Sequence, residues 1–124
     1  MLKSEQATAT IGVRDLDTAR RFYEDTLGLR PRDTHRPQVV LYKTGKSGLL
    51  VYKSEFGGTN KATSATWPVD DVDSLVEELK ERGVHFERYE IPGCEHRGDV
   101  HVKGSWRGAW FKDPEGNIHH LVSR

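Results

Sequence analysis

The sequence predicts an α+β domain built from two tandem βαβββ modules. The main observation is an internal repeat: after a shift of 56 positions, residues 8–18 align with residues 64–74, and five of the aligned residues are identical. Each copy begins with alternating polar and apolar residues, which indicate a half-buried strand, and continues with apolar residues at helical spacing. The 124 residues are therefore predicted to form a single domain, 1–124, with modules at about 7–56 and 63–123.

The first strand of each module is expected at 7–13 and 63–69. Successive side chains of a strand point to opposite faces. The apolar positions 9, 11 and 13 therefore share one face, while Thr8 and Thr10 lie on the other. Trp67 is the counterpart of position 11, so we expect it in the core.

A helix is expected after each of these strands. Asp15 and Asp71 are the expected N-caps, because an aspartate carboxylate accepts hydrogen bonds from the exposed N–H groups of a first helical turn. Gly28 and Gly83 follow at the points where a left-handed residue commonly ends a helix. The apolar residues at helical spacing are Leu16, Ala19, Phe22, Tyr23 and Leu27 in the first helix, and Val72, Leu75, Val76 and Leu79 in the second.

Three strands are expected after each helix. They are placed near 29–33, 38–44 and 48–54 in the first module, and near 84–89, 107–112 and 117–123 in the second. The sequence DPEGN at 113–117 predicts a turn between the last two strands, because proline and glycine suit the backbone angles of a turn. The segment 91–105 is long for a loop, and we expect it to act as a lid.

The composition argues against two classes of binding partner, nucleic acid and anionic membranes. Lysine and arginine together number 19, as do aspartate and glutamate, so the chain lacks the basic surplus of a nucleic-acid or anionic-membrane protein. The single cysteine, Cys94, excludes an internal disulfide. The sequence also lacks both the apolar stretch of a signal peptide and the run of about 20 apolar residues that spans a bilayer. We therefore expect a cytoplasmic protein with neither nucleic acid nor membrane as its partner.

Five segments carry a resemblance to a known family: Val13–Leu16, Phe22–Leu29, Val69–Val72, Arg82–Val84 and Trp110–Asn117. They resemble the vicinal oxygen chelate superfamily, which includes glyoxalase I, bleomycin-resistance proteins, fosfomycin-resistance enzymes and extradiol dioxygenases. The resemblance implies curled mixed sheets that surround a cup, and a homodimer for a chain of this length. Because one fold can host unrelated chemistries, the resemblance by itself assigns no activity.

The resemblance also implies where a metal would be held, on the first and last strands of each module. The matching positions in this sequence are Thr8, Val51, Ser64 and His120. Only His120 is a good ligand, whereas a catalytic divalent metal normally needs about three histidine or carboxylate ligands. We therefore predict no cofactor, and a divalent metal is disfavoured.

His120 is the candidate catalytic residue. If the last strand keeps the register of the family, His120 points into the cup, where it could act as a general base or hydrogen-bond an anionic or phenolic ligand. The alternative is a buried histidine with its hydrogen bonds satisfied, and the sequence leaves both readings open. Its neighbour His119 faces the opposite side, toward the core.

Aromatic residues are expected to form part of the cup. Of the adjacent pair Trp110 and Phe111, we assign Trp110 to the cup, and Trp106 could close over a flat ligand from the end of the lid. Aromatic walls with a few hydroxyl groups suit a planar, mostly apolar molecule. Alternatively, these side chains could simply fill the cup. The predicted ligand-binding residues are Thr8, Thr10, Val51, Ser64, Thr66, Trp106, Trp110 and His120.

Two further groups are interpreted as solvated surface. Cys94, His96 and His101 lie in the expected lid, but their spacing matches no defined metal site. The other group is a locally basic stretch near a strand end, formed by Arg30, Arg32, His35 and Arg36.

Three functions follow from these observations. The first is a metal-free dimeric cup that binds a small planar or drug-like molecule, as bleomycin-resistance proteins do. The second is a lyase, isomerase or dioxygenase of the same superfamily that depends on His120 or on a metal. The third is a dimeric domain that acts through a protein partner. The missing metal ligands favour the first, and the sequence leaves open whether the protein is an enzyme.

Overall fold

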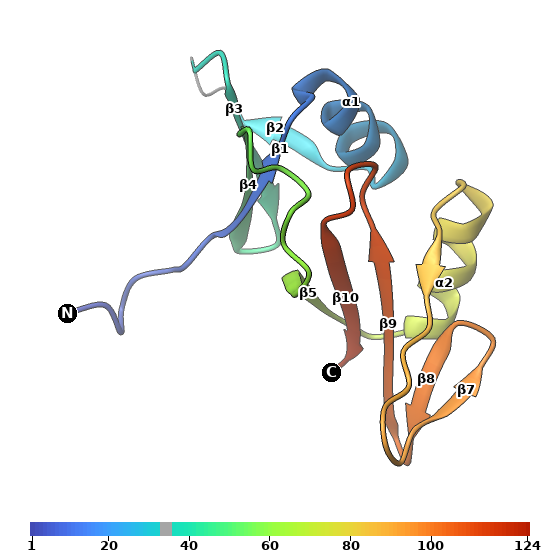
Figure 1. The fold of residues 1–124 in the computed structure, drawn as a ribbon. Coiled ribbons are helices and arrows are strands. Elements are labelled where there is room, and N and C mark those ends of the chain that lie inside the picture. Colours follow the sequence, from blue (N-terminus) through green and yellow to red (C-terminus); the bar gives the residue numbers. More distant parts are fainter. Residues whose placement is uncertain (33–35) are drawn as a thin grey trace.

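The computed structural model of the protein describes residues 1–32 and 36–124 and contains two β-sheets, each with a helix on one face (Figure 1). The predicted α+β class is confirmed. Among the described residues, no helix is long and apolar enough to cross a membrane.

The first module forms a four-stranded sheet, here called sheet A, in the order β1-β4-β3-β2. Its first and last strands, β1 and β4, are parallel neighbours. The elements are β1 (Ala9–Val13), α1 (Leu16–Arg20), a π-helical continuation η1 (Arg21–Thr26), β2 (Arg30–Arg32), β3 (Val39–Thr44) and β4 (Ser47–Lys53).

The second module forms sheet B, in the order β5-β10-β9-β8-β7, with β6 also paired to β9. The parallel pairing of first and last strands recurs between β5 and β10. The elements are β5 (Thr63–Val69), α2 (Val72–Glu81), β6 (Phe86–Glu87), β7 (Glu95–Arg97), β8 (Val100–Lys103), β9 (Trp106–Lys112) and β10 (Ile118–Ser123).

The prediction that residues 91–105 form a lid is wrong. Most of the segment 91–105 belongs to the β7–β8 hairpin, which extends sheet B beyond β9. The physical reason is alternation: Val100 and Val102 are buried in the core on one face of β8, so the strand is held in the sheet. Glycines at 98 and 104, both with positive φ, allow the tight turns at either end of β8.

The predicted helix signals are confirmed. The Asp15 side chain accepts a hydrogen bond from Thr18 N–H at 3.1 Å, and Asp71 accepts one from Ser74 N–H at 3.0 Å. Gly28 ends the first helical segment with φ 75°, a conformation that residues with a Cβ rarely adopt. Behind the helices, apolar side chains of each sheet form a core, and Trp67 packs against both cores from β5.

A buried hydrogen-bond network joins the two modules; we call it the Asp113 network. The Tyr23 hydroxyl, from η1, donates to the Asp113 carboxylate at 2.7 Å. His119 Nδ1 accepts from Trp67 Nε1–H at 3.0 Å, so the neutral ring carries its proton on Nε2 and donates to the Tyr23 oxygen at 2.9 Å. Asn117 Nδ2 donates both to Asp113 and, across the module boundary, to the Gly12 carbonyl.

The DPEGN turn reaches the first module at a second point. The Glu115 carboxylate accepts hydrogen bonds from the backbone N–H groups of Arg14 and Asp15, at the start of α1. A negative charge is favourable there because helix N-termini present free N–H groups and a positive dipole end. The β9–β10 turn therefore fixes the position of the first helix relative to sheet B.

We expect Tyr23→Phe to destabilise the protein by about 1–3 kcal/mol, because His119 Nε2–H loses its buried acceptor. The matched control is Tyr42→Phe. The Tyr42 hydroxyl donates to Glu24, whose carboxylate is partly exposed and also paired with Arg20, so its loss should cost under about 1 kcal/mol. Urea unfolding measures both, and equal losses would contradict a special role for the network.

We also expect the free energy of unfolding to fall as the pH drops from about 6.5 to 4. Burial lowers the pKa of His119 from 6.5 to about 4, so in this window the unfolded chain binds a proton that the folded chain does not. The change is about 3 kcal/mol, and above pH 6.5 His119 contributes no pH dependence.

The His119 effect is measured by comparing urea unfolding of the wild type and His119→Phe across this pH range. The variant should show a smaller loss in acid, although carboxylates and the buried His101 and His120, whose pKa values are also lowered, still contribute. His85→Phe, at an exposed histidine, is the control and should keep the wild-type slope. Identical slopes for wild type and His119→Phe would refute the assignment.

Candidate functional site

The candidate site lies on the face of sheet B that is turned away from α2. Strand alternation in β10 sends His119 into the core and His120 to this opposite face. His120 is the neighbour of Trp110 on β9 and of Thr66 on β5. The register therefore brings together three of the predicted residues that come from different parts of the sequence.

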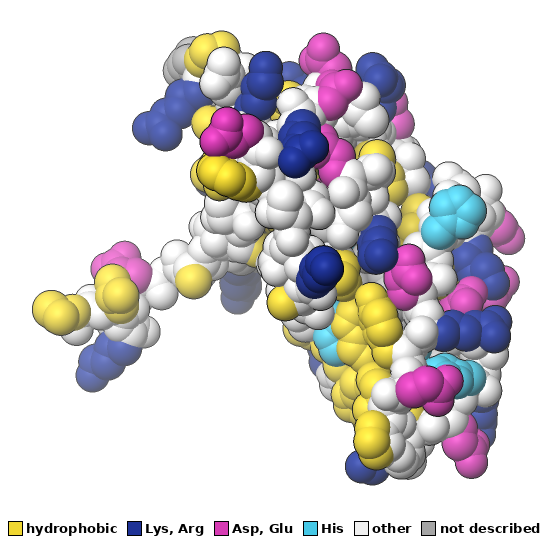
Figure 2. Space-filling model, in the orientation of Figure 1, with side chains coloured by type: hydrophobic (Ala, Val, Ile, Leu, Met, Phe, Trp, Pro, Cys, Tyr) yellow, Lys and Arg dark blue, Asp and Glu magenta, His cyan; other side chains and the backbone are white. Residues whose placement is uncertain are grey.

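Two tryptophans and His120 form a continuous surface, which we call the aromatic face. The rings of Trp110 and His120 are stacked, with centroids 4.2 Å apart and planes 4° from parallel. Trp106 lies 6.3 Å from Trp110 and 6.2 Å from His120 between ring centroids. Figure 2 shows hydrophobic side chains gathered over β9 and β10 in this part of the molecule. Aromatic rings grouped in this way suit the ring system of a ligand.

Gly108 makes the position of Trp106 attainable. A Cβ atom at residue 108 would lie 2.5 Å from Trp106 Cη2 and 3.0 Å from His120 Nε2. Trp106 therefore lies across the glycine, with the edge of its ring close to the His120 nitrogen. Any larger residue at position 108 would displace the indole.

His120 has a buried nitrogen without a partner. Among the described residues, its Nε2 is the buried side-chain nitrogen or oxygen that forms no hydrogen bond. Burial, followed by the nearby His101, lowers the pKa of His120, so the ring is neutral near pH 7. Buried polar atoms are seldom left unpaired, because the lost hydration is not replaced. The nitrogen therefore keeps an unused hydrogen-bonding position.

His101 corrects the expectation of a solvated loop. It is fully buried on β8, and its ring meets the edge of Trp110 at 4.8 Å between centroids. Its Nε2 accepts from Tyr89 N–H at 2.9 Å, so the proton on Nδ1 is directed to the Gly108 carbonyl at 3.3 Å. Burial lowers the pKa of His101, and this neutral ring packs against Trp110 on the same face of the sheet.

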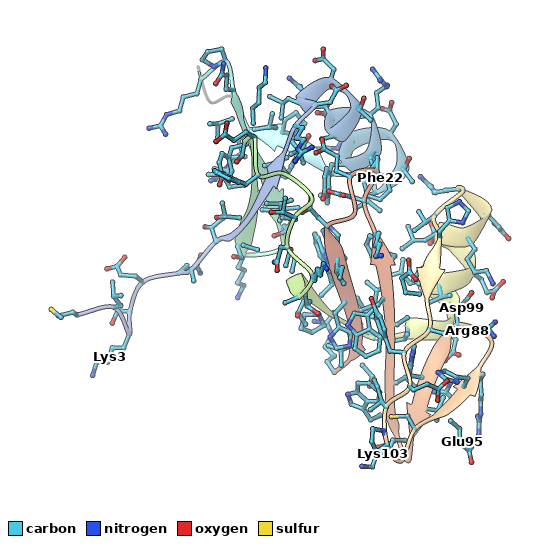
Figure 3. The ribbon with its side chains drawn as sticks, viewed as in Figure 1. Lys3, Phe22, Arg88, Glu95, Asp99 and Lys103 are labelled. Atoms are coloured by element: carbon cyan, nitrogen blue, oxygen red, sulfur yellow. The ribbon has the colours of Figure 1, made fainter. Side chains whose placement is uncertain are left out.

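The signal that could have identified His101 is the alternation of residues 100–103, in which one histidine stands between two valines. His96, by contrast, is exposed on β7, although its Nε2 lies 3.0 Å from the Tyr89 carbonyl oxygen. Cys94 is half-buried and is a free thiol. Figure 3 shows Glu95 and Lys103 at the end of this hairpin, away from Phe22 at the other end of the sheet.

The other predicted ligand-binding residues, and the basic stretch, lie outside the aromatic face. Thr8 and Thr10 are exposed and belong to the start of sheet A, where the Thr10 hydroxyl donates to the Thr8 carbonyl. The Ser64 hydroxyl accepts from Asn60 at 3.2 Å. In the basic stretch, Arg30, Arg32 and Arg36 are exposed, and His35 lies outside the described residues.

A model of the Glyoxalase/Bleomycin resistance protein/Dioxygenase superfamily matches residues 6–121. The chain belongs to this superfamily. A comparison with curated protein sequences gives no significant match.

Solved structures of superfamily proteins have the same fold at low sequence identity. A bleomycin resistance determinant encoded on transposon Tn5 is 18% identical, covers 98% of each chain and has a TM-score of 0.72. Lactoylglutathione lyase from Agrobacterium tumefaciens is 20% identical over 99% of this chain and 96% of its own, with a TM-score of 0.72. The fosfomycin resistance protein FosX from Listeria monocytogenes is 16% identical over 100% and 93%, with a TM-score of 0.68.

The structure corrects one of the metal positions implied by the superfamily. Val51 is 1% exposed and lies in the core of the first module, so its side chain cannot line a cup. In sheet B, His120 pairs with Thr66; in sheet A, the residue that pairs with the equivalent Thr10 is Leu50. A shift of one residue along a strand moves every side chain to the other face. The counterpart of His120 is therefore Leu50.

The four superfamily metal positions in this chain are thus Thr8, Leu50, Ser64 and His120. A leucine, two hydroxyl groups and one imidazole do not form the ligand set of a catalytic divalent metal. Over the described parts of the chain, no group of three or more histidine, cysteine, aspartate or glutamate side chains is arranged to hold a metal ion. The residues of the site do not fit the metal of the superfamily.

A hollow of about 640 Å³ lies apart from the aromatic face, between the two sheets near the start of β1. Its walls include Ala9, Trp67 and Pro68, and its charged groups are Lys43 and Arg124. It contains no histidine, cysteine or carboxylate side chain, so it offers fewer reactive groups than the aromatic face.

We expect protein purified without chelator to contain far less than one transition-metal ion per chain, because His120 is the one strong donor at the superfamily positions. Elemental mass spectrometry of the untagged protein, before and after dialysis against Zn²⁺ or Mn²⁺, measures this directly. Stoichiometric metal that survives dialysis and is lost in His120→Ala would overturn the interpretation of the ligand set.

Proposed function

We propose that this protein binds a small planar, drug-like molecule on the aromatic face, without a metal ion. The observation that carries the proposal is the stack of Trp110 on His120, with Trp106 beside it and the unpaired His120 Nε2 at its edge. Stacking on the indole rings would bind the apolar part of the ligand, and the nitrogen would orient it.

The superfamily supports this proposal but leaves alternatives. One structural neighbour is a bleomycin resistance determinant, and another is a lactoylglutathione lyase. Their shared fold shows that the same architecture serves both resistance and catalysis, so the residues of the site must decide. A ligand set with one good metal donor and an aromatic surface favours binding without metal.

We further propose that a second copy of the chain closes the site. Within one chain the two sheets lie side by side, with their main contact between β1 and β5, so sheet A does not cover sheet B (Figure 1). Sheet A offers apolar residues on its face away from α1, including half-buried Leu41 and Leu50 and the 38%-exposed Tyr52. Burial of these two apolar surfaces against each other would stabilise a dimer and enclose a ligand.

The second candidate function is a metal-independent enzyme in which His120 acts as a base. The supporting observation is again the free Nε2 of a neutral imidazole, which can accept a proton from a bound substrate. A compound that binds and is converted by the wild type, but not by His120→Ala, would establish this function.

We expect a panel of naphthalene-, acridine- and anthraquinone-based compounds to include some that raise the melting temperature. A ligand present at about 100 times its Kd stabilises the native state by about 2.7 kcal/mol. Trp110→Ala should abolish the shift, because it removes the main stacking surface. Light scattering on the same samples should give the mass of two chains.

Trp67→Phe is the matched control for this panel. Trp67 is also half-buried but lies on the core side of β5, so the variant should be less stable and yet keep the ligand-induced shift. The proposal fails if the compounds produce no shift in wild-type protein, or if Trp67→Phe loses the shift as completely as Trp110→Ala.

A further inference from the structure

The free nitrogen of His120 places a requirement on the ligand. Nε2 is buried without a hydrogen bond within the described residues, and both Nε2 and the Trp106 ring lie beside the space above Gly108. A molecule that stacked on Trp110 without reaching Nε2 would leave this polar atom unpaired. The site is therefore best completed by a ligand that carries a hydrogen-bonding group at one edge of its ring.

The surroundings of His120 limit the charge of that group. Its neighbours on the sheet are Thr66 and Trp110, and the nearby His101 is a neutral ring because burial lowers its pKa. Lys112, two residues from Trp110 on β9, is paired with Glu87 at 3.5 Å. Without an unpaired cation beside Nε2, a ligand that is already anionic would lose its hydration with little in return.

A neutral hydroxyl group meets both conditions. It can donate to Nε2 when the ring proton is on Nδ1, and it can accept when the proton is on Nε2, so it pairs with either neutral tautomer. A carbonyl or an ether oxygen can only accept and would suit one tautomer. A hydroxyl on an aromatic ring also lies in the ring plane, which is the direction in which a ligand stacked beside His120 would present it.

We propose that the ligand is a planar aromatic compound with a phenol-type hydroxyl group that pairs with His120 Nε2 when Trp106 moves away from Gly108. This inference rests on the proposed function, because it assumes that the aromatic face is the binding site. Trp106 follows directly on the turn at Gly104, whose φ is 59°, and its side chain is half-buried. In this proposal the indole covers Nε2 in the free protein and packs over the ligand once displaced.

The test compares 4-nitrophenol with 4-nitroanisole, in which a methyl ether replaces the hydroxyl group. Titration calorimetry is carried out at a pH below the pKa of the phenol, so that both probes are neutral. We expect 4-nitrophenol to bind about tenfold more tightly, which is the ratio that one hydrogen bond of ordinary strength provides. Its absorption spectrum should remain that of the neutral phenol, and a bound phenolate would overturn the neutral pairing.

His120→Phe removes the nitrogen but keeps a flat ring on Trp110. It should reduce the affinity for 4-nitrophenol to that for 4-nitroanisole and leave the latter unchanged. His85→Phe, at an exposed histidine, is the matched control and should keep the preference. If His120→Phe does not fold, as judged by circular dichroism, His120→Leu serves instead, because it also replaces the ring nitrogen with an apolar side chain.

Trp106→Ala tests the displacement of the indole. Because Nε2 is then uncovered, stopped-flow measurements should show faster association of 4-nitrophenol than in the wild type. An unchanged association rate would overturn the covering role of Trp106.

The outcomes separate the two proposals. Equal binding of the two probes to the wild type would refute the hydroxyl requirement and leave the aromatic site intact. A preference that survives His120→Phe, or His120→Leu in its place, would place the hydroxyl elsewhere and also refute it. If neither these probes nor the larger aromatic compounds bind, the proposed function fails together with this inference.

Discussion

The Asp113 carboxylate is the point on which the arrangement of the two modules depends. It accepts hydrogen bonds from Tyr23 of the first module and from Asn117 of its own turn, and it is 5% exposed. A buried charge of this kind is tolerated only when its hydrogen bonds are satisfied. The Tyr23 oxygen also accepts a hydrogen bond from His119 Nε2–H. The network therefore fixes the last strand, β10, at the boundary between the sheets.

The candidate site follows from that constraint. His119 and His120 are adjacent in β10, and strand geometry sends their side chains to opposite faces. The hydrogen bonds of His119 to Trp67 and Tyr23 therefore also determine where His120 points. On the other face, the same register stacks His120 on Trp110, so one strand carries both the structural network and the candidate site.

The two modules share one fold but differ chemically at equivalent positions. The pairing of first and last strands is parallel in both sheets, and Thr10 and Thr66 occupy equivalent positions in it. Opposite them stand Leu50 in sheet A and His120 in sheet B. One module therefore presents an apolar surface and the other an aromatic surface with a polar atom, a complementarity that suits two copies closing around one ligand.

Sequence patterns alone determined the duplicated strands and the helix caps at Asp15 and Asp71, because these depend on local periodicity and hydrogen bonding. The tertiary structure alone decided the rest. A one-residue register placed Val51 in the core, and pairing with β9 drew the expected lid into sheet B and buried His101. Such outcomes depend on contacts between residues far apart in the chain, which no local pattern encodes.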